Sequence, residues 1–112
     1  MPAHGFATLD DVALDDVVEV PAAEVVTAAG VMLMTASARK LGLAADGEPE
    51  LDLDEASLLI TALAGLVAAS QEHLGPHRQP LRDGLRTLQE GFREASSVPV
   101  EPGQGPGEDL VP

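Results

Sequence analysis

Four of the six basic residues of this chain fall within residues 78–96, although the chain of 112 residues holds 19 acidic side chains and has a formal net charge of −13. Their spacing places them with one glutamine on the same side of a helix, because successive helical residues are about 100° apart. Guanidinium groups bind carboxylates and phosphates through paired hydrogen bonds. We call this group the arginine ridge, and it is the candidate for binding a partner: Arg78, Arg82, Arg86, Gln89 and Arg93.

The sequence leaves three interpretations of the arginine ridge open. The arginines can form a solvated boundary whose aliphatic stems cover apolar surface while their charged groups stay in water. They can meet acidic residues of the same chain or of a second copy, such as those of residues 10–19 or 46–54. They can also bind phosphate or an acidic partner, for which four arginines suffice as a local clamp.

Two other groups have the residue types of metal ligands, but their context is unfavourable. His73 and His77 are four residues apart, yet Gly75 and Pro76 lie between them and interrupt any helix that would align them. The alternating acids of residues 46–54 lack the glycine and the final glutamate of a calcium-binding loop. Surface histidines and a solvated acidic connector are therefore expected, with no metal and no cofactor.

The sequence offers no residue that we expect to be catalytic. The chain has no cysteine, no glycine-rich phosphate loop and no nucleophile elbow. Pro2 would become the amino terminus after removal of Met1, but a proline base needs a desolvated pocket, and none is indicated around it. The chain is therefore not predicted to be an enzyme.

The elements that must position these residues are predicted to be three helices, at about residues 21–41, 53–73 and 79–95. Pro21 and Pro80 suit first helical positions, Gly42 suits the left-handed position after a helix, and Asp52 with Glu55 resembles a capping box. The fold class is an all-α antiparallel three-helix bundle with the helical domain at residues 21–95. It follows an acidic flexible arm at residues 1–20 and precedes a disordered, Pro/Gly-rich tail at residues 96–112.

The first two helices are apolar nearly all round, which three helices alone cannot cover. The sequence therefore predicts that a second copy completes the bundle as a homodimer. On the first helix, Val25, Val26, Ala29, Met32, Leu33 and Ala36 are expected to face the core. The residues on the opposite faces of the two helices are the expected oligomer interface: Thr27, Val31, Met34, Ala38, Thr61, Ala64, Gly65 and Ala68.

Charge and hydropathy limit the surroundings in which the chain is expected to act. A net charge of −13 disfavours general binding to DNA or to anionic membranes. The uncharged runs are shorter than the roughly 20 apolar residues that a membrane span needs. We therefore expect a cytoplasmic protein that does not enter a membrane.

Four sequence blocks in order resemble a known family: EVPAAEVVTAAGVMLMTASARKLGL, LDEASLLITALAGLVAAS, RQPLRDGLRTLQEGFREASSVP and PGQGPGE. Together they are similar to the short bacterial proteins grouped as domain of unknown function 1844. The likeness covers about residues 19–108, and departs from relatives at the arm and at Asp109 and Leu110. It implies a small helical domain with no established activity, cofactor or catalytic residue, and it favours a link to translation.

These observations lead to one expected function and two alternatives. The chain is expected to be a non-enzymatic protein-interaction module whose third helix presents the arginine ridge to a protein partner. The first alternative is a ribosome- or RNA-associated accessory factor in translation. The second is a small-ligand-binding protein or an enzyme subunit.

Overall fold

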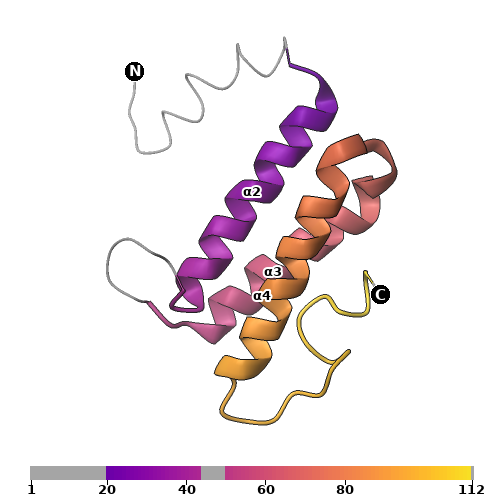
Figure 1. Cartoon of the computed structure of the whole chain (residues 1–112). Helices are drawn as coiled ribbons and strands as arrows, with labels where there is room; N and C mark the ends of the chain where they lie inside the picture. Colours follow the sequence, from indigo (N-terminus) through magenta and orange to yellow (C-terminus); the bar gives the residue numbers. More distant parts are fainter. Residues whose placement is uncertain (1–19, 44–49, 112) are drawn as a thin grey trace, which may run out of the picture.

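The computed structural model describes residues 20–43 and 50–111, and three long helices dominate these ranges (Figure 1). Helix α2 spans Ala22–Lys40, α3 spans Leu53–Ser70 and α4 spans Arg78–Ala95. Two 3-10 turns, η2 at Gln71–His73 and η3 at Gly75–His77, join α3 to α4. Successive helices run in opposite general directions in Figure 1. The all-α, three-helix fold predicted from the sequence is confirmed, whereas the predicted arm lies, except for Val20, outside the described residues.

The carboxyl end of α2 is closed by a Schellman motif, as Gly42 predicts. Gly42 has a φ of 76°, its N–H donates to the Arg39 carbonyl at 3.0 Å, and the Leu43 N–H donates to the Ala38 carbonyl at 2.8 Å. These bonds satisfy carbonyls that the end of a helix leaves without a partner. The left-handed φ is open to glycine at little cost, which explains the residue type.

The start of α3 is capped by Asp52, but only half of the capping box forms. The Asp52 carboxylate accepts a hydrogen bond from the Glu55 N–H at 3.1 Å. The Asp52 N–H donates to the Lys40 carbonyl at 2.8 Å instead of meeting the Glu55 side chain. The backbone of α3 is thus tied directly to the end of α2.

A second contact closes the same connection. The Lys40 Nζ lies 2.9 Å from the Glu50 carboxylate, and Leu41 pairs with Leu51 in an isolated antiparallel bridge. The hydrogen bond to Glu50 is the main cause that raises the pKa of Lys40 above its ordinary value. The two ends of the connector are therefore held together across residues 44–49, which include Asp46 and Glu48 of the proposed acidic run and are not described.

Helix α4 begins at residue 78, one residue before the predicted 79 and two before Pro80, which was expected at the first helical position. Arg78 is the first helical residue, so Pro80 is the third rather than the first. The position is tolerated because the first four N–H groups of a helix have no intrahelical acceptor.

The core lies where the three helices meet, and α3 contributes half of its fully buried positions. Ala56, Ile60, Leu63, Ala64 and Val67 of α3 are inaccessible to solvent. Residues 53–73 also meet the length and composition of a membrane-spanning helix, with a mean hydropathy of 1.5. In this fold their apolar side is packed inside a bundle. The other buried apolar residues are Leu41, Leu74, Leu81, Leu85 and Leu88.

Helix α2 turns to the core a face that only partly overlaps the predicted one, since Val26 and Leu33 pack against the core as predicted. Gly30 and Ser37 are buried at its centre, and Met34 packs against the core, whereas Met32 is 56% exposed and Ala29 is exposed. The small residues allow close approach, and the Ser37 hydroxyl is satisfied by the Leu33 carbonyl at 2.7 Å. The prediction is wrong for Ala29 and Met32, because the fully buried positions of α2 belong to Gly30 and Ser37, which are not apolar side chains.

Close packing explains the glycines in α2 and α4. A Cβ at Gly30 would lie 3.0 Å from Leu81 Cδ2, and one at Gly84 would overlap the terminal methyl of Met34. Helices α2 and α4 therefore approach each other closely at these glycines.

Three of the eight predicted oligomer-interface residues lie inside the single chain. Met34 and Ala38 pack against the core, and Ala64 is fully buried. Thr27 and Gly65 are half-buried. Val31, Thr61 and Ala68 are exposed, so only these three remain fully available to a second copy.

Candidate functional site

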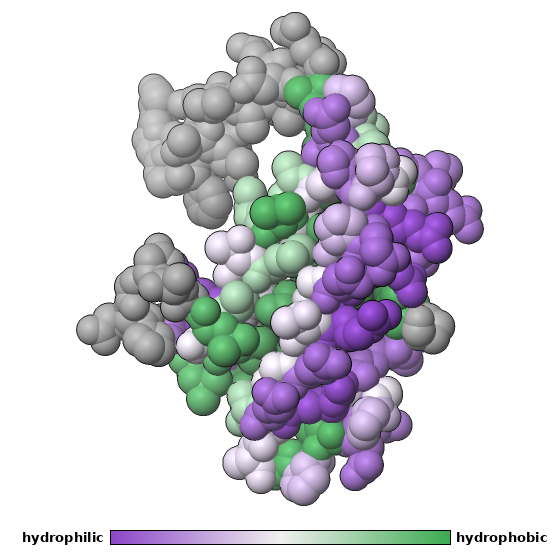
Figure 2. Space-filling model, viewed as in Figure 1, coloured by the Kyte–Doolittle hydropathy of each residue, from purple (hydrophilic) through white to green (hydrophobic). Residues whose placement is uncertain are grey.

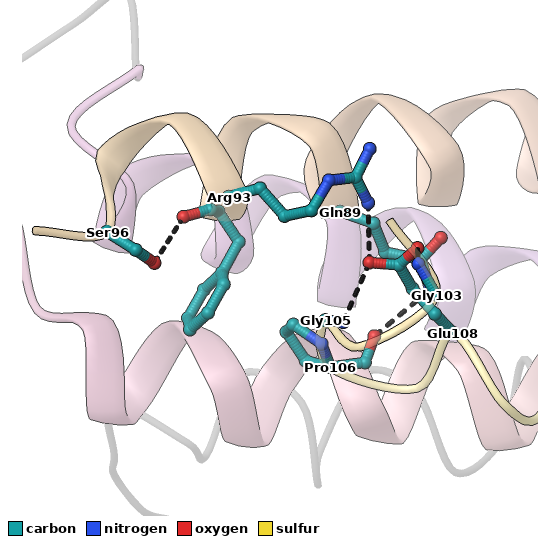
Figure 3. A network of polar contacts seen from close by, with 8 residues as sticks. Gln89, Arg93, Ser96, Gly103, Gly105, Pro106 and Glu108 are labelled. Atoms are coloured by element: carbon teal, nitrogen blue, oxygen red, sulfur yellow. Dashed lines mark hydrogen bonds and ion pairs between the residues drawn. The ribbon is translucent and has the colours of Figure 1, made fainter. Parts of the chain in front are cut away.

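The tail, residues 96–111, folds back along α4 and does not behave as the disordered segment that its composition predicts (Figures 1 and 3). Gly105 and Gly107 are buried, and Val111 packs against the core. A Cβ at Gly107 would overlap the Ala64 side chain and lie 3.5 Å from the Thr61 Cα. This close approach to α3 is open only to glycine, which has no side chain and tolerates the φ of 71° found here.

Glu108 is the acidic residue that the arginine ridge meets (Figure 3). Its carboxylate lies 2.5 Å from the Arg93 guanidinium and accepts hydrogen bonds of 2.9 Å from the N–H groups of Gly103 and Gly105. The Arg93 and Glu108 side chains are 20% and 13% exposed. The second interpretation of the ridge is therefore correct for Arg93, but the acid comes from the tail and not from residues 10–19 or 46–54.

These contacts set the ionisation of Glu108. Burial alone raises the pKa of its carboxyl, but hydrogen bonds from Gly103, Arg93 and Gly105, with the charge of Arg93, outweigh it. The net pKa of Glu108 lies below its ordinary value of 4.5. The carboxylate is therefore held in its charged form.

Gln89 is the second point at which the tail covers α4. Its side chain is 6% exposed, and its Nε2 donates to the Pro106 carbonyl at 3.0 Å. The sequence placed Gln89 on a partner-binding surface, but in this fold the chain's own tail occupies that position. The amide is used to hold the backbone of the tail.

A pocket of about 410 Å³ remains between α4 and the tail. Three bases, two acids and two apolar side chains line it together with Gln89 and Gly103. They are Arg82, Arg86, Arg93, Glu90, Glu108, Leu85 and Val111. Because Glu108 is paired with Arg93, the pocket presents the remaining two arginines against Glu90 alone.

The other arginines of the ridge have weaker contacts within the chain than Arg93. Arg82 donates to the neutral amide oxygen of Gln71 at 2.5 Å, which leaves its charge uncompensated by that partner. Arg86 lies 3.8 Å from Asp83, and both side chains are more than half exposed, so this pair contributes little. Arg78 is exposed in the first turn of α4, outside the residues that line the pocket. The structure thus divides the ridge into an inner part, Arg93 and Gln89, and an outer part.

The remaining candidates from the sequence do not come together. His73 and His77 are exposed and belong to separate 3-10 turns. Across residues 20–43 and 50–111, no group of three His, Cys, Asp or Glu side chains is arranged to hold a metal ion. Pro2, Asp46 and Glu48 lie outside the described residues, and Glu50, Asp52 and Asp54 are exposed.

The tail residues of the site were missed because Pro/Gly-rich composition was taken to mean disorder. A signal was present in the alternation of glycines at Gly103, Gly105 and Gly107 directly before Glu108. Glycines at alternate positions permit tight turns in which consecutive N–H groups point at one anion. The acid that follows them is the anion.

Comparison with known proteins gives a family and nothing more specific. No curated protein and no solved structure matches the chain. A family model described as a domain of unknown function, DUF1844, matches residues 23–94, which is more than half of the chain. The matched segment contains all three helices and the whole arginine ridge, and it ends before the tail. The chain therefore belongs to the DUF1844 family.

Proposed function

We propose that this chain is a protein-interaction module that binds an acidic segment of a partner protein in the pocket between α4 and the tail. The observation that carries the proposal is the state of Arg82 and Arg86. Both line the pocket, and their contacts are to a neutral amide and to one exposed, distant carboxylate. Such arginines retain the capacity to bind a carboxylate with paired hydrogen bonds.

The pair of Arg93 and Glu108 supports the choice of a carboxylate as the ligand group. It is a carboxylate already held on this helix face by a guanidinium and backbone N–H groups. Leu85 and Val111 supply apolar surface in the same pocket. A partner segment with an acidic residue beside a small apolar one fits this lining.

The charge of the whole chain favours a short acidic segment over a nucleic acid. A net charge of −13 repels an extended polyanion, whereas two arginines suffice for one or two carboxylates. The RNA-associated role expected as an alternative would need a larger basic surface, and it becomes an outcome of the test.

The test is crosslinking through a photoreactive residue placed at position 90, an exposed position of α4 that lines the pocket, in cells that make the full chain. We expect a discrete crosslinked protein that disappears when Arg82→Gln and Arg86→Gln are combined. The matched control combines Ala62→Glu and Ala69→Glu on exposed α3, which changes the net charge by the same amount. The crosslinked site on the partner, read by mass spectrometry, is expected to be acidic.

Three outcomes contradict the proposal. One is a crosslinked protein that persists in the double arginine variant, and another is its equal loss in the charge-matched control. The third is crosslinking to RNA that weakens steeply with salt, which would favour the ribosome-associated alternative.

A further inference from the structure

The outer face of α2 is an apolar helix surface that no described segment covers. Val31 and Met32 are 50% and 56% exposed, and Ala28 and Thr35 are exposed beside them. The Thr35 hydroxyl donates to the Val31 carbonyl at 3.1 Å, so this side chain is internally satisfied. The surface over α2 in Figure 2 is accordingly pale to deep green, in contrast to the purple surface over α4.

Only two charged residues belong to this face, and they lie near its opposite ends. Glu24 is exposed in the first turn of α2, and Arg39 is half-exposed in the last turn. With Ala28, Val31 and Thr35 they form a stripe at spacings of four, three, four and four residues, which is one side of a helix.

The stripe on one α2 helix matches the same stripe on a second, antiparallel α2 helix in charge and in side-chain type. If two copies of α2 lie antiparallel about a two-fold axis between Val31 and Met32, Ala28 lies opposite Thr35, and Glu24 lies opposite Arg39. Each unlike pair then occurs twice, and the apolar residues meet at the centre. Arg39 has five N–H donors, so it can bind the partner's carboxylate in addition to any contact within its own chain.

From this arrangement we infer that α2 pairs antiparallel with α2 of a second copy, in the register that joins Glu24 to Arg39. The interface is thus the outer side of α2 around Val31 and Met32, and it shares only Val31 with the oligomer interface expected from the sequence. The outer face of α3 is a poorer candidate. Its charges are Asp54 and Glu55 in the first turn, and its last turn has no base to meet them in a reversed copy.

The size of the contact sets the expected strength of the dimer. A helix of 19 residues is about 28 Å long. One helix pair of this length buries less than a standard interface of about 1,600 Å². The full chain is therefore expected to dissociate into monomers on dilution, which makes the equilibrium measurable by sedimentation.

Two variants that change the net charge equally test whether the dimer forms through the outer face of α2 or through that of α3. Met32→Glu is expected to weaken the dimer at least tenfold in sedimentation equilibrium, with an unchanged helical circular dichroism spectrum. Leu58→Glu is the matched control, because Leu58 is 66% exposed on α3. A full chain that stays monomeric at high concentration, or a dimer that Leu58→Glu disrupts and Met32→Glu does not, overturns the inference.

Engineered cysteines test the register, since the natural chain has none. A mixture of the Ala28→Cys and Thr35→Cys proteins is expected to form a disulfide between the two, while each protein alone does so poorly. In the inferred register two copies of position 28 are about 10 Å apart along the axis, which exceeds the reach of a disulfide. Equal crosslinking of the separate proteins and of the mixture contradicts the register.

Charge exchange provides the last check. Glu24→Arg alone and Arg39→Glu alone are each expected to raise the dissociation constant several-fold, and the two together are expected to restore it. A double variant as weak as either single variant rules out the proposed pairing. Neither change touches α4 or the tail, so this inference can fail while the proposed function stands.

Discussion

Glu108 is the residue on which the shape of the candidate site depends. Its carboxylate satisfies Arg93 and two backbone N–H groups of the tail at once, and Arg93 and the Gly105 N–H are partly withdrawn from water, whereas Gly103 is exposed. Hydrogen bonds to charged groups contribute about 1.5–3 kcal/mol each when they are withdrawn from water, and less at a partly exposed site. One side chain therefore fixes a turn that its glycine-rich sequence would leave mobile.

Replacing Glu108 by Gln should lower the free energy of unfolding by about 1–2 kcal/mol, because the Arg93 guanidinium loses its carboxylate at a site where both side chains are largely covered. The measurement is urea denaturation of the full chain. Asp109→Asn is the control, since Asp109 is exposed and carries the same charge one residue further along. Equal effects of the two substitutions would show that Glu108 has no special role.

The lowered pKa of Glu108 also gives this contact a pH dependence. Because the folded pKa lies below the unfolded one, the stabilisation is present above the ordinary pKa of about 4.5. It is lost as the pH falls through the lower folded value. At neutral pH the contact is complete.

At the scale of the helices, packing is decided by small residues at the crossing points. Gly30 and Ser37 are the buried residues of α2. On α4, Gly84 leaves room for the Met34 side chain of α2. Hydropathy predicted the existence and bounds of all three helices within a few residues. It predicted the inner side of α2 only in part, placing Val26 and Leu33 correctly but missing Gly30, because a glycine contributes nothing to an apolar face yet allows the closest approach.

Two glycines in helix interiors should therefore respond to alanine in opposite ways. At Gly65 a Cβ would meet nothing within 4 Å, so Gly65→Ala should stabilise the protein by about 0.5–1 kcal/mol through helix propensity. At Gly30 the Cβ would crowd both terminal methyls of buried Leu81, so Gly30→Ala should show no gain or a loss. The measurement is thermal or urea unfolding, and a similar gain at both sites would contradict the packing described.

At the scale of the whole molecule, an acidic segment covers part of the basic helix. The Glu108 carboxylate of the tail neutralises the charge of Arg93 on α4. The sequence indicated correctly that Arg82, Arg86 and Arg93 share a helix side. It could not indicate that the tail covers Arg93 and Gln89, since residues 89 and 106 are brought together by the turn after α4 and not by periodicity. Composition describes what an isolated segment does, whereas the position of the tail depends on a surface that another segment provides.

The central claim is that the tail closes over α4 and that Glu108 completes the arginine pocket. It is tested most directly by nuclear magnetic resonance of the ¹⁵N-labelled full chain during a pH titration. We expect the amides of Gly103 and Gly105 to be as rigid on the nanosecond timescale as those of α4, and to shift together with a midpoint below 4.5 that Glu108→Gln abolishes. Amides with the mobility of a free chain, or a midpoint at the ordinary glutamate value, would contradict the account.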